Sequence, residues 1–277
     1  MTLAVARRLL ALAASTAIVT ACAGGSTQSS TSSTAPGSVT RAPLTIVGAA
    51  SLRGALQKAG AAWETTHPAS PLTLSTDSSA ALETQLEQGA PADVFVSADT
   101  TNPKKLVDKG LADGAAVNVA GNVLTIVVPT ANPAGIRTPF DLARPGVKVI
   151  AAGDDVPITT YANEAVANLA KQPNAPRNFA AGYASNVVSK EDNVKAVIAK
   201  IELGEGDAGI VYVTDAKAST KVATVAIPDA ANVPATYAGV VVKASVHAAT
   251  AHEFLDWLAG PDGGAILKTF GFLPPAD

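Results

Sequence analysis

Cysteine, histidine and aromatic residues are scarce in this 277-residue chain, and their scarcity excludes several kinds of protein. A single cysteine rules out a disulfide framework and a thiolate metal cluster. The three histidines, His67, His247 and His252, show no metal-ligand spacing such as H-E-x-x-H. Hydrophobic residues make up 48% of the chain and aromatics only 4%, so we expect a core built mainly from Ala, Val, Leu and Ile, without direct protein ligands to a metal.

Basic residues are also too few for a nucleic-acid partner. From Ala23 onward the chain carries 18 Lys and Arg against 23 Asp and Glu, whereas neutralising phosphates requires clustered positive charge. No P-loop or G-x-G-x-x-G follows a strand-like segment, and no G-x-S-x-G elbow is present. We therefore expect no enzyme, with an extracellular hydrolase as the weaker alternative.

The N-terminus has the features of a secretory signal. Arg7 and Arg8 precede a short apolar run that ends in VTAC at residues 19–22. These four residues resemble the lipobox of bacterial lipoproteins, in which the cysteine receives diacylglycerol and becomes the N-terminus after cleavage. The resemblance implies a lipoprotein signal peptide over residues 1–22 and lipid attachment at Cys22. The alternative is a plain signal peptide with an incidental cysteine.

Residues 23–43 are rich in Ser, Thr, Gly and Pro and are expected to form a flexible tether. From Leu44 onward, strand-like and helix-like patterns alternate, which predicts parallel sheets with helices on both faces. The expected strands are at 44–50, 72–76, 93–98, 123–129, 147–153, 208–214, 222–228 and from 235. The main expected helices are at 51–67, about 79–88, 161–171, 192–203 and within 249–272. The pattern permits two α/β lobes, the first formed by 44–124 plus 236–277 and the second by 125–235.

Small or polar residues stand where predicted strands give way to helices. They are Ser51, the pair Ser78 and Ser79, and the turn at residues 154–161. In open α/β sheets such junctions lie at the carboxyl ends of strands, where ligands bind. Helix N-termini add unpaired N–H groups and a partial positive charge, which suit an anion. For each serine taken alone, ordinary N-capping is the alternative.

Five segments, in order, resemble the molybdate-binding protein (ModA) family of bacterial ABC importers. They are VGAASLRGAL (47–56), DSSAALETQLEQGAPADVFVSAD (77–99), GDDVPITTYANEAV (153–166), EDNVKAVIAKIELGEGDAGIVYVTDA (191–216) and FLDWLAGPDGGAILKTFGF (254–272). The resemblance runs from about Leu44 to Phe272. It implies a two-lobed periplasmic-binding-protein fold of type II, with each lobe a mostly parallel sheet flanked by helices and a tetrahedral oxyanion in the cleft.

The resemblance also implies which residues hold the oxyanion. It places hydroxyl donors at Ser51 and Ser79, main-chain N–H donors at Ile158 and Val194, and a third hydroxyl at Tyr212. Molybdate carries no proton at neutral pH and can only accept hydrogen bonds, so a site of donors suits it and disfavours hydrogen phosphate.

Two features depart from the family pattern. The turn PITTY (157–161), which includes the expected donor Ile158, replaces a smaller turn that often contains glycine. Asp77 stands where a small neutral residue is common, and its carboxylate would repel a dianion. Sulfate has the same charge and acceptor pattern as molybdate, so only the size of the cavity separates the two ions. A receptor for sulfate on the same scaffold is therefore the main alternative. A ferric-ion receptor is disfavoured because the four tyrosines are dispersed along the chain.

The sequence thus predicts an extracytoplasmic, lipid-anchored solute-binding protein. It is expected to be a monomer without a cofactor that captures molybdate, and also tungstate, and delivers the ion to an ABC permease and its ATPase.

Overall fold

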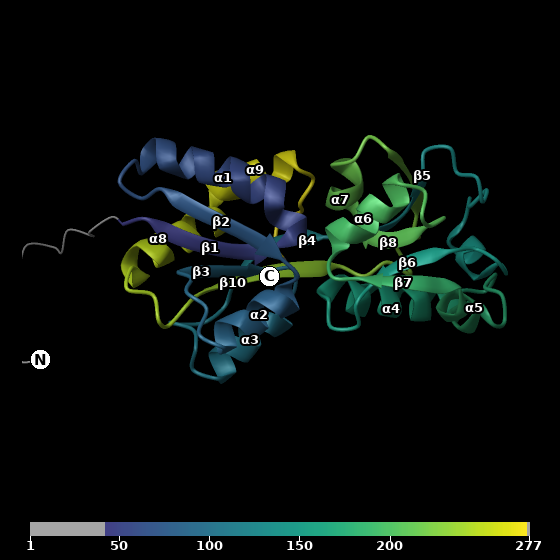
Figure 1. The fold of residues 1–277 in the computed structure, drawn as a ribbon, viewed down its shortest axis with the longest axis horizontal. Helices are drawn as coiled ribbons and strands as arrows, with labels where there is room; N and C mark the ends of the chain where they lie inside the picture. The colour runs from purple at the N-terminus through teal and green to yellow at the C-terminus, as the bar shows by residue number, and fades with distance from the viewer. Residues whose placement is uncertain (1–41, 276–277) are drawn as a thin grey trace, which may run out of the picture. The chain divides into compact units, whose positions relative to one another are not determined.

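The computed structural model describes residues 42–275, so the predicted signal peptide, Cys22 and nearly all of the predicted tether lie outside the described residues. Figure 1 shows two lobes, each with strands at its centre and helices outside. The strands are β1 (Leu44–Ala49), β2 (Leu72–Asp77), β3 (Val94–Ser97), β4 (Val117–Asn122), β5 (Leu124–Pro129), β6 (Val149–Ala152), β7 (Val187–Glu191), β8 (Gly209–Tyr212), β9 (Val222–Ala226) and β10 (Ala235–Val241). The α-helices are α1 (Arg53–Thr66), α2 (Ser79–Glu87), α3 (Thr101–Asp108), α4 (Pro157–Ala170), α5 (Phe179–Asn186), α6 (Val194–Glu202), α7 (Val213–Lys217), α8 (Ala248–Ala259) and α9 (Pro261–Thr269). Two 3₁₀ turns, η1 (Ala50–Leu52) and η2 (Pro139–Ala143), complete the elements.

The first lobe is built on one five-stranded sheet in the order β2-β1-β3-β10-β4. β1 pairs in parallel with β2 and β3, and the strand-to-helix connections that follow these strands supply the crossovers that parallel pairing requires. β10 returns from the second lobe and pairs antiparallel with β3 and β4. The carboxyl ends of β1 and β2 therefore lie side by side, with Ala49 opposite Asp77.

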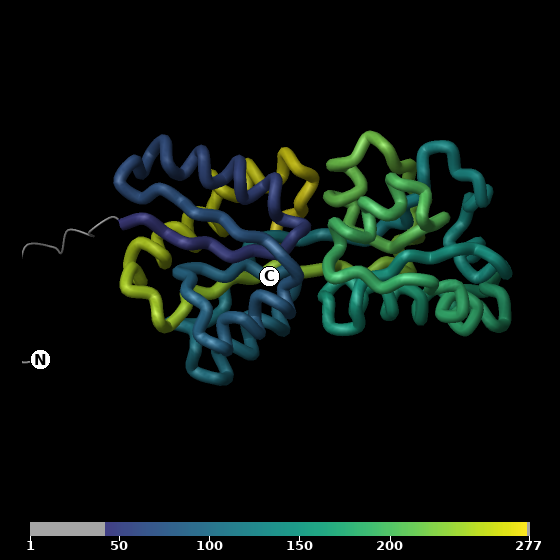
Figure 2. The backbone as a smooth tube through the Cα atoms, in the orientation of Figure 1, coloured from purple at the N-terminus to yellow at the C-terminus, as the bar shows by residue number. Residues whose placement is uncertain are grey.

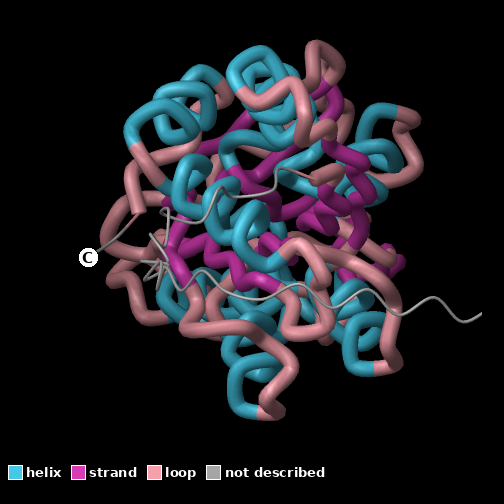
Figure 3. The backbone as a smooth tube through the Cα atoms, turned by 90° about the vertical axis from the view of Figure 1, so that its left-hand side faces the viewer, coloured by secondary structure: helices cyan, strands magenta, loops and turns pink. Residues whose placement is uncertain are grey.

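Both faces of this sheet are covered, as the side view in Figure 3 shows. On one face Trp63 of α1 packs edge-on against Phe254 and Trp257 of α8, with ring centroids 5.3 and 5.5 Å apart. On the other face, a smaller cluster joins Leu82 of α2 and Leu106 of α3 to strands β3 and β10. Burying these apolar side chains holds the helices against the two faces of the sheet.

The second lobe corrects the expectation of mostly parallel sheets. β6 and β7 are parallel, but the three-stranded sheet β8-β5-β9 is antiparallel throughout. β5 carries the chain out of the first lobe directly after β4, with only Val123 between them. β8 and β9 run back toward the first lobe, since Tyr212 at the end of β8 pairs with Leu124 at the start of β5. A strand that leaves the first lobe and strands that return toward it run in opposite directions, so their pairing is antiparallel.

Two segments connect the lobes, as the tube in Figure 2 shows. One is the β4–β5 junction, and the other leads from β9 to β10. The side chain of Asn232 joins them: its Oδ1 accepts from the Leu124 N–H at 3.0 Å, and its Nδ2 donates to the Leu124 carbonyl at 2.9 Å. This pair imitates one rung of a β-ladder. The lobe boundaries expected at 124/125 and 235/236 stay predictions.

Most expected elements are present, with some differences at their ends. α4 begins at Pro157 rather than near Tyr161, because proline fits the first turn of a helix, where no N–H is needed. Helices α3, α5 and α7 and strands β4 and β7 have no counterpart among the expected elements. Among the described residues, no helix combines the length and apolar character needed to cross a membrane.

Candidate functional site

The five residues expected to hold an oxyanion all line one small cavity between the lobes. Its volume is about 10 Å³, close to the smallest that accommodates a water molecule. Strand ends and helix N-termini from both lobes form its wall. The lining residues are Ala49, Ala50, Ser51, Asp77, Ser78, Ser79, Ala98, Val156, Pro157, Ile158, Asn193, Val194 and Tyr212.

Ser51 lies in the 3₁₀ turn that directly follows β1, and it is 7% exposed. The hydroxyl of Tyr237 donates a hydrogen bond to its Oγ at 3.0 Å. A serine hydroxyl has one hydrogen and two lone pairs. Because Tyr237 occupies one lone pair, the hydrogen of Ser51 remains available for a ligand.

Ser79 is the first residue of α2 and is 1% exposed. Its Oγ accepts a hydrogen bond from the Ala98 N–H at 3.0 Å, so its own hydrogen is likewise available. The alternative of simple capping does not describe this pair, because Ser78 occupies the N-cap position and its side chain makes no capping hydrogen bond. Ser79 is therefore held as a donor, and neither serine of the doublet closes the helix with its side chain.

Two helix N-termini of the second lobe face the same cavity. Ile158 is the second residue of α4 and Val194 is the first of α6, and N–H groups at these positions have no partner within the helix. Asn193 caps α6 by accepting from the N–H groups of Lys195 and Ala196. This cap pairs the N–H groups of Lys195 and Ala196 and leaves the Val194 N–H available for a ligand. Both helices also bring a partial positive charge toward an anion.

Tyr212 ends β8, is 1% exposed, and its hydroxyl has no hydrogen-bond partner among the described residues. Its ring packs edge-on against Tyr161 and Tyr237, with centroids 6.2 and 5.6 Å apart. Burial, and secondarily the nearby Tyr237, raises the pKa of Tyr212 well above its ordinary value near 10. The hydroxyl therefore stays protonated over the neutral range and can donate.

Asp77 lines the cavity and connects the two lobes across it. Its Oδ1 accepts from the Ser78 N–H at 2.8 Å and from Nδ2 of Asn193, across the cleft, at 3.1 Å. These two donors compensate part of the carboxylate charge that would repel an anion. Asp77 thus also acts as a contact that holds the lobes together.

Three residues at or beside the cavity were not among the expected ligands. Ser78 lines it, is 5% exposed, and its Oγ has no partner among the described residues. The serine doublet in the sequence was the available signal for it. Asn193 and Tyr237 have no local signal, because their contacts join segments distant in sequence.

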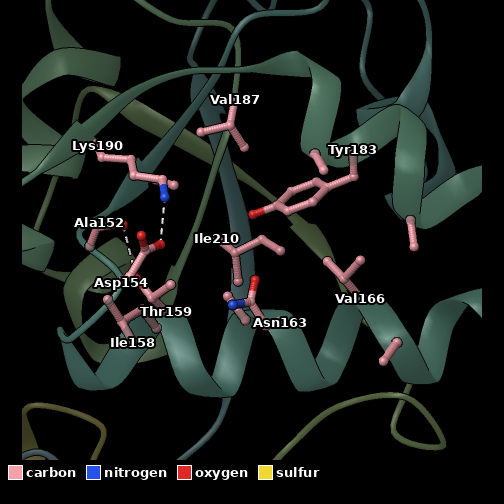
Figure 4. A pocket seen from close by; sticks show the side chains of 15 residues that line it. Ala152, Asp154, Ile158, Thr159, Asn163, Val166, Tyr183, Val187, Lys190 and Ile210 are labelled. Atoms are coloured by element: carbon pink, nitrogen blue, oxygen red, sulfur yellow. Dashed lines mark hydrogen bonds and ion pairs between the residues drawn. The ribbon is translucent and has the colours of Figure 1, made fainter.

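A second, larger pocket lies behind α4 and shares only Ile158 with the cavity. Its volume is about 360 Å³, and the Tyr183 hydroxyl and the Asn163 side chain point into it, with the Lys190–Asp154 ion pair at one side (Figure 4). Its lining is mainly apolar, so it lacks the convergent donors of the smaller cavity. Among residues 42–275, no group of three or more His, Cys, Asp or Glu side chains could hold a metal ion.

Comparison with known proteins supports this picture. ModA, the molybdate-binding protein of Mycobacterium tuberculosis strain H37Rv, is 36% identical over 235 residues, which cover 84% of this chain and 85% of that protein. YvgL of Bacillus subtilis, whose name includes "ABC transporter substrate-binding lipoprotein", is 31% identical over 263 residues, which cover 94% and 96% of the two chains. The solved structure of the periplasmic molybdate-binding protein of Azotobacter vinelandii matches with a TM-score of 0.70 at 24% identity, covering 84% of this chain and all of that one, which shows the periplasmic-binding-protein fold.

The family model for "Bacterial extracellular solute-binding protein" matches residues 44–273, nearly the whole described chain. The match covers both lobes and every residue that lines the cavity. The chain therefore belongs to the bacterial extracellular solute-binding proteins, a family of extracytoplasmic binding proteins rather than enzymes.

Proposed function

We propose that this protein captures molybdate, and tungstate as its chemical equivalent, in the cavity between the lobes, which at about 10 Å³ must widen as the lobes move apart to admit an ion of this size. Three hydroxyls, of Ser51, Ser79 and Tyr212, and two main-chain N–H groups, of Ile158 and Val194, would donate hydrogen bonds to the ion's oxygens. The 36% identity to ModA of M. tuberculosis supports molybdate as the ligand.

The convergence of donors without a countercharge is the observation that carries the proposal. No Lys, Arg or His is among the residues that line the cavity. Fixed dipoles and hydroxyls can replace the hydration of an anion, and donors to an ionised acceptor form the stronger class of hydrogen bond. A buried Lys or Arg would add its own desolvation cost. Such a site favours an anion whose oxygens all accept.

We further propose that the chain is attached to the membrane through a lipid on Cys22 and acts as a monomer that delivers the ion to an ABC permease driven by its ATPase. The lipobox-like residues 19–22 and the lipoprotein name of the B. subtilis relative support the anchor. Incorporation of a labelled fatty acid that is lost in Cys22→Ser would support the anchor, and equal incorporation by both proteins would contradict it.

Calorimetric titration of residues 23–277 against molybdate, tungstate, sulfate and phosphate tests the ligand. Tight binding of molybdate and tungstate, with weak binding of sulfate and phosphate, is the expected result. Preference for sulfate would keep the receptor role and overturn the named ligand, because sulfate differs from molybdate in size alone. No binding of any of the four ions would refute the oxyanion site.

A further inference from the structure

A chain of buried hydrogen bonds leads to Ser51 from the segment that connects the lobes. It begins at Asn122, the last residue of β4, passes through Tyr237 of β10, and ends at the serine. Asn122 and Tyr237 are 1% and 0% exposed, so water does not compete with these bonds. Neither residue lines the cavity.

The direction of each bond in this chain is fixed by its first member. The Val123 N–H, which can only donate, binds Oδ1 of Asn122 at 3.0 Å. Because Oδ1 of Asn122 faces the Val123 N–H, its Nδ2 must face Thr214 and Tyr237. The Nδ2 of Asn122 therefore donates, to Thr214 Oγ1 at 2.9 Å and to the Tyr237 hydroxyl at 3.3 Å.

The orientation of the amide then fixes the tyrosine. Tyr237 accepts from Asn122, so its single hydrogen is left to donate to Ser51 Oγ at 3.0 Å. Burial also raises the pKa of Tyr237 well above its ordinary value, which keeps that hydrogen in place. Ser51 in turn receives a hydrogen bond on Oγ and offers its own hydrogen.

We infer that Tyr237, oriented by Asn122, is a positioning residue that makes Ser51 a donor and thereby disfavours a protonated oxygen at the Ser51 side of the cavity. This inference rests on the proposed function. A monohydrogen anion brings a proton that needs an acceptor. Ser51 could accept it only through its second lone pair, and its own hydrogen, which Tyr237 does not accept, would then lose the anion as its acceptor. A fully ionised anion needs only the donor. The hydrogen-bond chain would thus separate molybdate from hydrogen phosphate without touching either.

Tyr237→Phe in the full chain tests this, with titration of molybdate, sulfate and phosphate at about pH 8, where phosphate is the monohydrogen dianion. Without the tyrosine hydroxyl, Ser51 is free to rotate and accept. Molybdate and sulfate are expected to bind roughly three- to tenfold more weakly, the loss typical of one hydrogen bond. Phosphate is expected to bind as well as before or better. The molybdate-to-phosphate preference therefore falls at least threefold, and the molybdate-to-sulfate preference does not change.

A purely structural role for Tyr237 predicts a different pattern. Equal weakening of all three anions, or phosphate binding that stays undetectable in the variant, would overturn the inference. Asn122→Ala is a second variant, expected to shift preference in the same direction by a smaller factor because Tyr237 keeps its hydroxyl. Tyr183→Phe is the matched control: it removes a buried tyrosine hydroxyl that faces the separate pocket of Figure 4, and should leave all preferences unchanged.

The same titrations separate the inference from the proposed function. If the unaltered chain binds molybdate and Tyr237→Phe has the same anion preferences as the unaltered chain, only the role of Tyr237 is refuted. An unaltered chain that binds none of the anions refutes both.

Discussion

Replacing Ser79 by alanine removes one donor from the cavity and one acceptor from the first lobe. Its Oγ accepts from the Ala98 N–H at 3.0 Å, and both residues are buried, at 1% and 4% exposure. The substitution should therefore have two effects that can be measured separately. One is on anion affinity, and the other is on the stability of the ligand-free protein.

The loss of affinity follows from the Ser79 hydroxyl, and the loss of stability follows from the Ala98 N–H. A hydrogen bond to a charged acceptor contributes about 1.5–3 kcal/mol, which corresponds to roughly a ten- to 150-fold weaker Kd for molybdate. The stranded Ala98 N–H is a buried donor without an acceptor, which costs about 1–3 kcal/mol of unfolding free energy. Calorimetry gives the first quantity and urea denaturation without ligand gives the second.

Ser70→Ala is the control, since Ser70 is a fully buried serine, at 0% exposure, outside the cavity. It should leave the Kd unchanged. If Ser79→Ala destabilises the protein but binds molybdate as the unaltered protein does, Ser79 is a structural residue and the assignment is wrong. If Ser70→Ala weakens binding equally, the effect comes from general destabilisation and the reasoning also fails.

Three further results are expected. Asp77→Asn should tighten molybdate binding roughly fivefold by removing about 1 kcal/mol of charge repulsion, and the gain should be smaller at high salt. Weaker binding would show that the hydrogen bond from Asn193 to Asp77 contributes more to affinity than the repulsion takes away. Lys195→Met should lower the unfolding free energy by about 3 kcal/mol, because it leaves the fully buried Asp215 carboxylate, 2.8 Å from the Lys195 amine, without its cation. Burial already raises the pKa of Asp215, so this loss should shrink as the pH falls and the carboxyl takes up a proton. A loss that does not change with pH would contradict the explanation. Burial raises the pKa of Tyr161 and Tyr183 to about 12, so above about pH 10 the unfolded chain releases protons that the folded chain keeps. Urea denaturation should therefore show the unfolding free energy falling from about pH 10 to 12. A rise over that range would refute the raised pKa of these tyrosines.

The location of the site could be predicted because its signals are local. Ser51 and Ser79 follow predicted strands directly, and the carboxyl ends of neighbouring parallel strands meet at one edge of a sheet. The start of α6 is likewise readable as a helix N-terminus, and the turn at 154–161 as a junction between a strand and a helix, although α4 begins four residues earlier than expected. Their convergence on one cavity depends on the arrangement of the lobes, which only the family resemblance supplied.

The contacts around the site could not be predicted from the sequence. Tyr237 lies 186 positions from Ser51, and Asp77 lies 116 positions from Asn193. No periodicity connects residues so distant, because β10 returns to the first lobe after the whole second lobe has been built. The antiparallel pairing of β5 with β8 and β9 was missed for the same reason: strand patterns show that a strand exists, but not its direction relative to neighbours brought in from elsewhere.

The pairing of Asn232 with Leu124 has a consequence for the thermodynamics of ion capture. A single flexible connection would let the lobes sample many orientations, and an ion with only a few contacts would have to order them when it binds. Two connections joined by a pair of hydrogen bonds leave the lobes fewer relative orientations than one connection would. Part of the entropy of ordering the lobes is therefore lost when the chain folds, before any ion arrives. A ligand of only five atoms can then be held tightly, because its few hydrogen bonds do not also have to assemble the cleft.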